Sequence, residues 1–163
     1  MAEMNDSFNE VTAEMLKVIS DYDSVTGFQG AYNIRQDSMC AGRKNSENIT
    51  IESKTDKPGI NIRVKPGTKG ETVYIPACVT HSNVDDLVYN DFFIGADADV
   101  VIVAGCGIHN CGGVDLTSRH DGVHTFYVGR NARVRYVEKH YGEGDGNGEN
   151  VMNPTTVAHL DEG

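Results

Sequence analysis

The chain has 163 residues, of which 39% are hydrophobic, and its formal net charge is −10. This length suits one domain with a hydrophobic core of its own. The excess of acidic residues argues against nucleic acid or an anionic membrane as the main partner, because both attract surfaces rich in Lys and Arg.

The sequence favours a cytoplasmic protein without membrane insertion. No apolar run approaches the roughly 20 residues that a membrane-spanning helix needs. The N-terminus carries Glu3 and Asp6 where a secretory signal would be basic and then apolar. In a reducing compartment we expect the cysteines to be thiols or ligands rather than disulfides. They are Cys40, Cys78, Cys106 and Cys111.

The first expected element is a helix from Ser7 to about Ser20. Ser7 and Glu10 have the spacing of a capping box. Apolar side chains, beginning with Phe8 and Val11, recur on one face at helical intervals. We therefore expect an N-terminal helical segment over residues 1–27.

The core is expected over residues 28–163 and consists of short strands. Residues 27–45 follow no clear pattern, but alternating Val and Ile positions then recur between turns rich in Gly, Asp and Asn. The expected strands are Asn48–Glu52, Ile60–Val64, Thr72–Val79, Leu87–Ile94, Val100–Val103, Val123–Val128 and Val134–Val137. Cys78 falls within one of them and is expected in the core.

Two of these segments repeat each other at an offset of 34 residues. The copies are Asp91-Phe-Phe-Ile-Gly-Ala-Asp-Ala-Asp-Val-Val-Ile-Val103 and Thr125-Phe-Tyr-Val-Gly-Arg-Asn-Ala-Arg-Val-Arg-Tyr-Val137. A repeat that cannot bury its own apolar face must stack on its neighbours, which is typical of a solenoid. With strands alone this predicts a β-helix, while a β-sandwich or a cupin-like roll is the alternative. The segment from Ala104 to Val123 is expected to leave the stack as a surface loop.

That segment contains the candidate chemistry. Cys106, His109 and Cys111 are closely spaced, and His120 and His124 follow. Thiolate and imidazole are the ligands that zinc, copper(I) and iron–sulfur centres prefer. The flanking glycines would let the chain fold around an ion. The spacing fits no standard zinc finger, so spacing alone favours a packed turn with hydrogen-bonded histidines over a metal or cluster site.

Acid–base catalysis is a further alternative. Asp115 and Asp121 lie near the histidine pair and could act as in a β-helix hydrolase or lyase. Nothing in the sequence fixes their geometry.

Several long motifs resemble the SufB/SufD family, the core proteins of the Suf iron–sulfur cluster assembly system, often labelled ABC-transporter-associated or permease-like. The resemblance covers nearly all of residues 28–163. Its motifs are Val103-Ala-Gly-Cys-Gly-Ile-His-Asn-Cys111, Ser118-Arg-His-Asp-Gly-Val-His-Thr-Phe126, Arg135-Tyr-Val-Glu-Lys-His-Tyr-Gly-Glu-Gly144 and Met152-Asn-Pro-Thr-Thr156.

The resemblance implies a right-handed parallel β-helix and a non-enzymatic scaffold for a transient iron–sulfur cluster. It implies a SufC-like ATPase, a cysteine desulfurase or sulfur carrier, and a SufB/SufD-type partner or a second copy as partners. Cys106 and Cys111 would carry persulfide or bind iron, with His109, His120 and His124 beside them. Nearby imidazolium would favour the reactive thiolate.

The chain departs from the family by stopping at Asp161-Glu-Gly163, so we expect a β-helix that is incomplete at its C-terminus. An open stack would favour association with another copy. No flavin is expected. A β-solenoid with a structural zinc ion and a β-helix hydrolase or lyase remain the alternatives.

Overall fold

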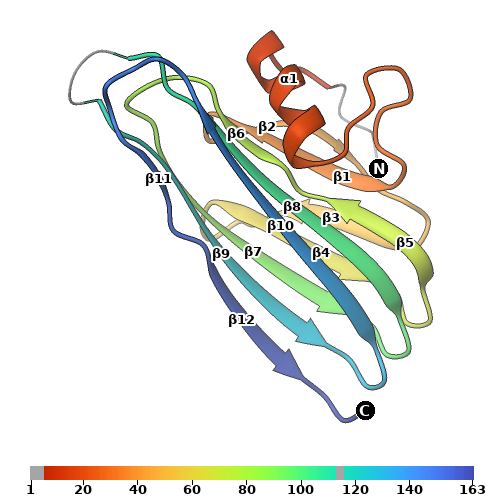
Figure 1. The fold of residues 1–163 in the computed structure, drawn as a ribbon. Coiled ribbons are helices and arrows are strands. Elements are labelled where there is room, and N and C mark those ends of the chain that lie inside the picture. Colours follow the sequence, from red (N-terminus) through yellow and green to blue (C-terminus); the bar gives the residue numbers. More distant parts are fainter. Residues whose placement is uncertain (1–5, 113–115) are drawn as a thin grey trace.

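A computed structural model describes residues 6–112 and 116–163 (Figure 1). These residues form one helix and twelve strands: α1 (Glu10–Ile19), β1 (Ala31–Gln36), β2 (Met39–Lys44), β3 (Ile49–Ser53), β4 (Gly59–Val64), β5 (Lys69–Tyr74), β6 (Ala77–Val79), β7 (Asp85–Ile94), β8 (Asp99–His109), β9 (Ser118–Val128), β10 (Arg133–Glu143), β11 (Asn150–Met152) and β12 (Thr155–Leu160). The expectation of a predominantly β protein with a short N-terminal helix is confirmed.

The strands form two mixed sheets. The first has the order β10-β8-β5-β1-β2, with β6 beside β1 and β8; the second has the order β11-β9-β7-β4-β3, with β12 beside β9. The hairpins β1–β2 and β3–β4 are antiparallel, and the other strand pairs are parallel. From β4 onward the chain passes back and forth between the sheets, so that consecutive passes stack beside one another.

The register of this stack follows the internal repeat. In the second sheet Phe92 pairs with Phe126, and in the first Asp99 pairs with Arg133. Both pairs are 34 positions apart, as the sequence repeat predicts. Because the strands are parallel and in register, residues 34 positions apart point to the same side and stack on each other.

Helix α1 covers the outer face of the first sheet (Figure 1). It begins later than predicted, because the N-cap is Asn9, whose side chain accepts a hydrogen bond from the Thr12 N–H, and not Ser7. Met15 and Ile19 are buried against the sheet together with Cys78. Among the described residues, no helix has both the length and the apolar character that crossing a membrane requires.

The glycines of β8 make room for this helix. A Cβ atom at Gly105 would lie 2.2 Å from the carbonyl oxygen of Ile19, and one at Gly107 would lie 2.6 Å from the Met15 sulfur. A Cβ atom does not approach other heavy atoms that closely, so Gly105, which faces the helix backbone, needs glycine, whereas a side chain at Gly107 would force the Met15 side chain to shift. These glycines therefore serve helix packing; the expectation that they wrap the chain around an ion is wrong.

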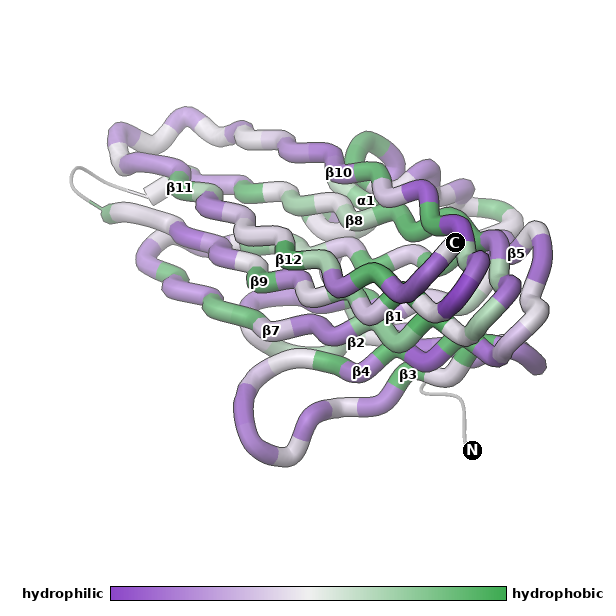
Figure 2. Tube along the Cα trace, turned by 90° about the horizontal axis from the view of Figure 1, so that it is seen from below, coloured by the Kyte–Doolittle hydropathy of each residue, from purple (hydrophilic) through white to green (hydrophobic). Residues whose placement is uncertain are grey.

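The expected loop from Ala104 to Val123 is also wrong at both of its ends. β8 continues to His109, and β9 already begins at Ser118. Glycine is a weak strand former, which hid the continuation of β8. Residues 27–45 likewise contain β1 and β2, where polar inward residues interrupt the apolar alternation. Figure 2 shows the hydrophobic and hydrophilic segments that alternate along the strands.

The space between the sheets has an apolar end. Phe92 is fully buried, and its ring stacks on that of Phe126 with centroids 4.4 Å apart. Ile62, Val100 and Ile102 belong to the same cluster. We call this cluster the apolar end of the interior.

Candidate functional site

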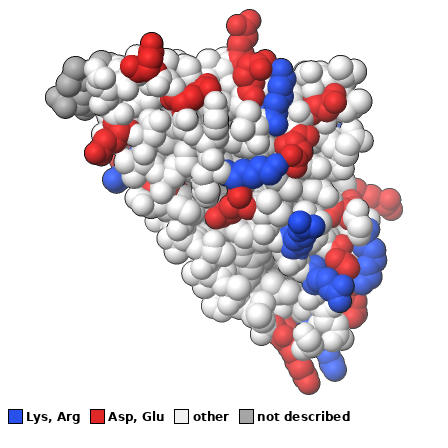
Figure 3. All heavy atoms as spheres, viewed as in Figure 1, with Lys and Arg blue, Asp and Glu red and all other residues white. Residues whose placement is uncertain are grey.

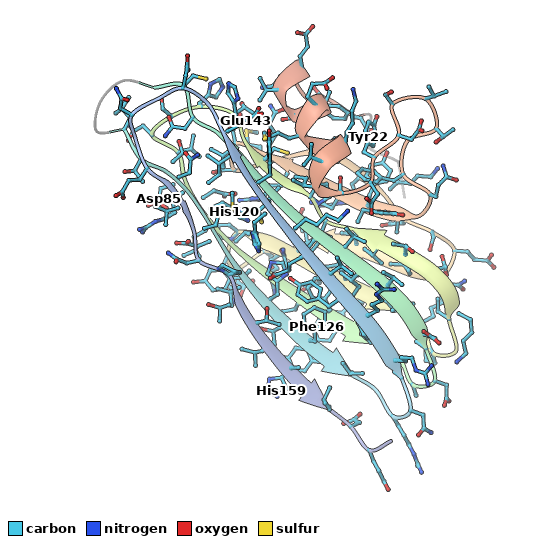
Figure 4. The ribbon with its side chains drawn as sticks, viewed as in Figure 1. Tyr22, Asp85, His120, Phe126, Glu143 and His159 are labelled. Carbon is cyan, nitrogen blue, oxygen red and sulfur yellow. The ribbon has the colours of Figure 1, made fainter. Side chains whose placement is uncertain are left out.

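The other end of the same interior is polar. Figure 4 shows His120 and Phe126 at different heights along β9, both pointing into the space between the sheets. Around His120 lie Arg35 of β1, Asp86 of β7, Cys106 of β8 and His140 of β10. These five residues, with Glu138 and Tyr136 of β10 and His124 of β9, form what we call the polar end of the interior.

Asp86 is the buried anion of this group. Its Oδ2 atom lies 2.9 Å from His120 Nδ1, and its Oδ1 atom lies 2.7 Å from Arg35 Nη2. Burial alone would raise the pKa of Asp86, but the hydrogen bonds from His120 and Arg35 outweigh burial and hold that pKa well below its ordinary value. Asp86 is therefore ionised, and His120 donates to it through Nδ1–H.

Because Nδ1 of His120 is engaged by Asp86, its other nitrogen is the one available to Cys106. Burial lowers the pKa of His120, but the hydrogen bonds to Asp86 and Cys106 raise it to about 10. His120 is thus an imidazolium ion at neutral pH.

Cys106 lies between two histidines. It interacts with His120 across the interior and with His140, its partner in the register of β8 and β10. Burial raises the pKa of the Cys106 thiol, but the two imidazoles more than offset this and lower it below its ordinary value. The His140 pKa is raised, first by its bond to Cys106. The site therefore favours a thiolate, the nucleophilic form of cysteine.

The chain of contacts continues from His140 to His124. His140 Nε2 lies 3.6 Å from Glu138 Oε2, and the other carboxylate oxygen, Glu138 Oε1, accepts a hydrogen bond from the Tyr136 hydroxyl. Tyr136 has one proton, so it must accept from His124 Nδ1–H at 2.9 Å. Burial lowers the pKa of His124 to about 4, so this ring is neutral.

The space beside Cys106 is small. A cavity of about 20 Å³ is lined by residues that include Cys106, His120, His124 and Asn90. This volume accommodates roughly one water-sized atom. Gly122 keeps the space open between the two histidines, since a Cβ there would lie 2.6 Å from His124 Nε2.

Cys111 and His109 form a separate pair at the end of β8. Cys111 is exposed, and its sulfur lies 2.9 Å from His109 Nε2. On the opposite edge of the ring, His109 Nδ1 lies 2.8 Å from Glu143 Oε1. Glu143 also accepts from the Tyr141 hydroxyl, and these bonds, Tyr141 first, lower the Glu143 pKa. The carboxylate therefore orients the imidazole towards the thiol, as outer partners of metal-binding histidines do.

The predicted site residues thus fall into two groups rather than one. Cys106, His120 and His124 share the polar end, while His109 and Cys111 lie together elsewhere. Within residues 6–112 and 116–163, no three His, Cys, Asp or Glu side chains are arranged to hold a metal ion.

The remaining candidates lie apart from both groups. Cys78 is buried, as predicted, and it packs with residues of α1. Burial, followed by the effect of Cys106, raises its pKa to about 12. Asp121 accepts from the Asn153 N–H. Asp115 lies outside the described residues.

Sequence reasoning missed Arg35, Asp86, Glu138, Tyr136 and His140. A signal for two of them was present, because the repeat offset pairs Asp86 with His120 and Cys106 with His140. The same offset pairs His109 with Glu143. Applying the repeat to the polar positions would have found these contacts.

A scan of protein-family models, a search of curated proteins and a search of solved structures each found no match to this chain.

Proposed function

We propose that the chain is a scaffold component of Suf-type iron–sulfur cluster assembly, acting with a SufC-like ATPase, and that Cys106 carries sulfur in it. The observation that carries this proposal is a thiol between His120 and His140 beside a cavity of about 20 Å³. Such a site stabilises a thiolate and has room for one added atom. The motif resemblance supports the same function independently.

The sulfur-transfer step uses groups that this chain supplies. The Cys106 thiolate attacks the outer sulfur of a donor persulfide, the donor's sulfur–sulfur bond breaks, and a new one forms on Cys106. The donor leaves as a thiolate that takes a proton from His140, and His140 then regains a proton from the S–H group of the new Cys106 persulfide. His120 stays protonated against Asp86 and stabilises the persulfide anion that remains.

In this proposal the iron–sulfur cluster is the cargo that the scaffold passes on, and it is assembled away from the Cys106 cavity. The cavity beside Cys106 is too small for several iron and sulfur atoms. Cys111 Sγ and His109 Nε2 face each other at 2.9 Å and are exposed enough to bind one iron as two of its ligands. Glu143 would orient His109 from behind. The other ligands would come from a partner protein or a second copy.

The proposal includes the fold expected of this family, a right-handed parallel β-helix. Three features support it: parallel strand pairs, a chain that passes back and forth between two sheets, and one register of 34 residues in both sheets.

A partner, or a second copy, would cover the strand β12. All six of its residues are exposed, including Leu160 at 73%. Between Asn150 and Leu160 the sequence has no Lys, Arg, Asp or Glu. Figure 3 shows a broad uncharged area on the lower left of this view. Sheet edges that must stay unpaired usually carry charges, so an uncharged edge favours pairing with another chain.

The proposal is tested by loading sulfur and iron separately. The chain is treated with glutathione persulfide and analysed by mass spectrometry, and then reconstituted anaerobically with iron and sulfide. We expect Cys106→Ser to abolish persulfide loading and Cys111→Ser to abolish the visible chromophore, while Cys40→Ser changes neither. Loading that is unaffected by Cys106→Ser would refute the role of this thiol.

A further inference from the structure

A groove of about 510 Å³ adjoins the cavity of Cys106 and gathers cations on a chain whose net charge is −10. Its lining includes Arg35, Arg43, Lys54 and Lys57. We call it the cationic groove. Its size is typical of sites that bind small molecules.

Two of these cations have no anionic partner among the described residues. Arg43 donates from Nε to Asn33 Oδ1 at 2.8 Å and from Nη2 to Ser53 Oγ at 2.9 Å, and both acceptors are neutral. The Lys57 ammonium lies 4.6 Å from the centre of the Tyr89 ring. Neither forms an ion pair with a carboxylate in the part of the chain that the structure describes.

The carboxylates near the groove leave this positive charge uncompensated. Asp86 is occupied by Arg35 and by His120, which is itself cationic. Lys54 is paired with Asp91. Asp85 also lines the groove, and it is exposed to solvent, which screens its charge.

The groove also offers neutral donors and a connection to the interior. The hydroxyls of Ser38 and Ser53 line it. It shares lining residues with the Cys106 cavity, so the two spaces adjoin. The shared residues are Asn33, Arg35, Gly59 and Ile60.

From this arrangement we propose that the cationic groove binds a small tetrahedral oxyanion, a phosphate group or a sulfur oxyanion, at the mouth of the Cys106 cavity. A guanidinium held by neutral acceptors keeps N–H donors and full charge for an anion, and a nearby ammonium adds a second charge. This site goes beyond the proposed function, since it requires neither a cluster nor a persulfide.

The test is calorimetric titration of the full chain with inorganic phosphate and, separately, with thiosulfate, against chloride at matched ionic strength. We expect saturable binding of at least one of the two oxyanions. Arg43→Gln should weaken it about tenfold, as loss of a charge-assisted hydrogen bond does, and Lys57→Gln should weaken it several-fold. Asp85→Asn should strengthen it, because a rim carboxylate is removed.

Arg135→Gln is the matched control, because Arg135 is an exposed residue on β10 that does not line the groove. It should leave the affinity unchanged. Binding of phosphate alone or thiosulfate alone identifies the class of oxyanion. The inference is overturned if neither anion binds saturably, or if Arg135→Gln weakens binding as much as Arg43→Gln and Lys57→Gln do. No iron, sulfide or ATPase is present in the titration, so its failure would leave the proposed function standing.

Discussion

The two ends of the interior are built on the same strands but are held together by different forces. Along β7, Phe92 packs at the apolar end and Asp86 is hydrogen-bonded at the polar end. Dispersion and burial tolerate small changes of shape, whereas a buried charge depends on each of its partners. The comparison indicates that many packing contacts contribute to the stability of the scaffold, whereas its chemistry depends on a few hydrogen bonds.

The largest expected effect comes from Asp86→Asn. The change keeps the side-chain volume but leaves two cations, Arg35 and His120, without their buried anion. We expect a loss of about 3–5 kcal/mol in the free energy of unfolding. The exposed neighbour Asp85→Asn should change it by less than about 0.5 kcal/mol. Urea unfolding measures both.

The loss of unfolding free energy in Asp86→Asn should depend on pH in a direction that the pKa of His120 sets. Asp86 stabilises the imidazolium of His120, whose pKa is raised to about 10. That stabilisation is complete below the unfolded pKa of about 6.5 and disappears as the pH rises through 10. The difference between wild type and Asp86→Asn should therefore narrow at high pH; a constant difference would contradict the ion pair.

His124 lies where the two ends meet and should respond to acid in the opposite sense. Its folded pKa is lowered to about 4, so the folded state resists its protonation. Stability from the neutral ring is present above pH 6.5 and is lost as the pH falls towards 4, by roughly 3 kcal/mol in all. His124→Phe, which can stack on Phe92, should remove this acid sensitivity.

The exposed His159 on β12 is the matched control. If His159→Phe flattens the acid profile as much as His124→Phe does, the assignment to His124 is wrong.

At the apolar end, Phe92→Leu should have a smaller effect. Leucine keeps most of the volume, so we expect a cost of about 1 kcal/mol. The ultraviolet absorbance of the Cys106 thiolate, followed against pH, should be unchanged, whereas Asp86→Asn should shift its titration upwards. Equal shifts in both variants would mean that the two ends do not act separately.

The smallest change in stability is expected from Leu160→Lys. Leu160 pairs in register with Val128, which packs on the apolar cluster, yet it remains exposed. A lysine there should alter the free energy of unfolding by less than about 0.5 kcal/mol. Sedimentation should show that it converts an assembly of the wild type into monomers; a monomeric wild type would remove the proposed pairing at β12.

The sequence predicted what depends on repetition. Phe92 and Phe126 stand at equivalent positions, and the structure pairs them in that register. The helix was also predictable from its apolar face, although local hydrogen bonding moved its cap to Asn9. Asp86 was missed because the repeat was applied only to apolar positions, although the same offset pairs Asp86 with His120. Arg35 lies outside the repeat, and a lone arginine in a strand resembles many surface arginines until its neighbours are known.

The site residues show the same limit. Cys106 and Cys111 looked like parts of one ligand set because five positions separate them in the sequence. Cys106 turns into the interior, whereas Cys111 lies beyond the end of β8. Closeness in the sequence indicated which residue types the site contains. The direction of each side chain along the strand decides which of these residues contact one another.

The alternation within β8 places two unrelated demands on five consecutive residues. Ala104, Cys106 and Ile108 face one environment, and Gly105 and Gly107 touch α1 on the other side. A single peptide layer therefore separates an apolar helix face from a thiol whose pKa is lowered. A substitution in this pentapeptide must fit both the helix and the interior. A change that improves the site at Cys106 can therefore persist only if the packing against α1 tolerates it.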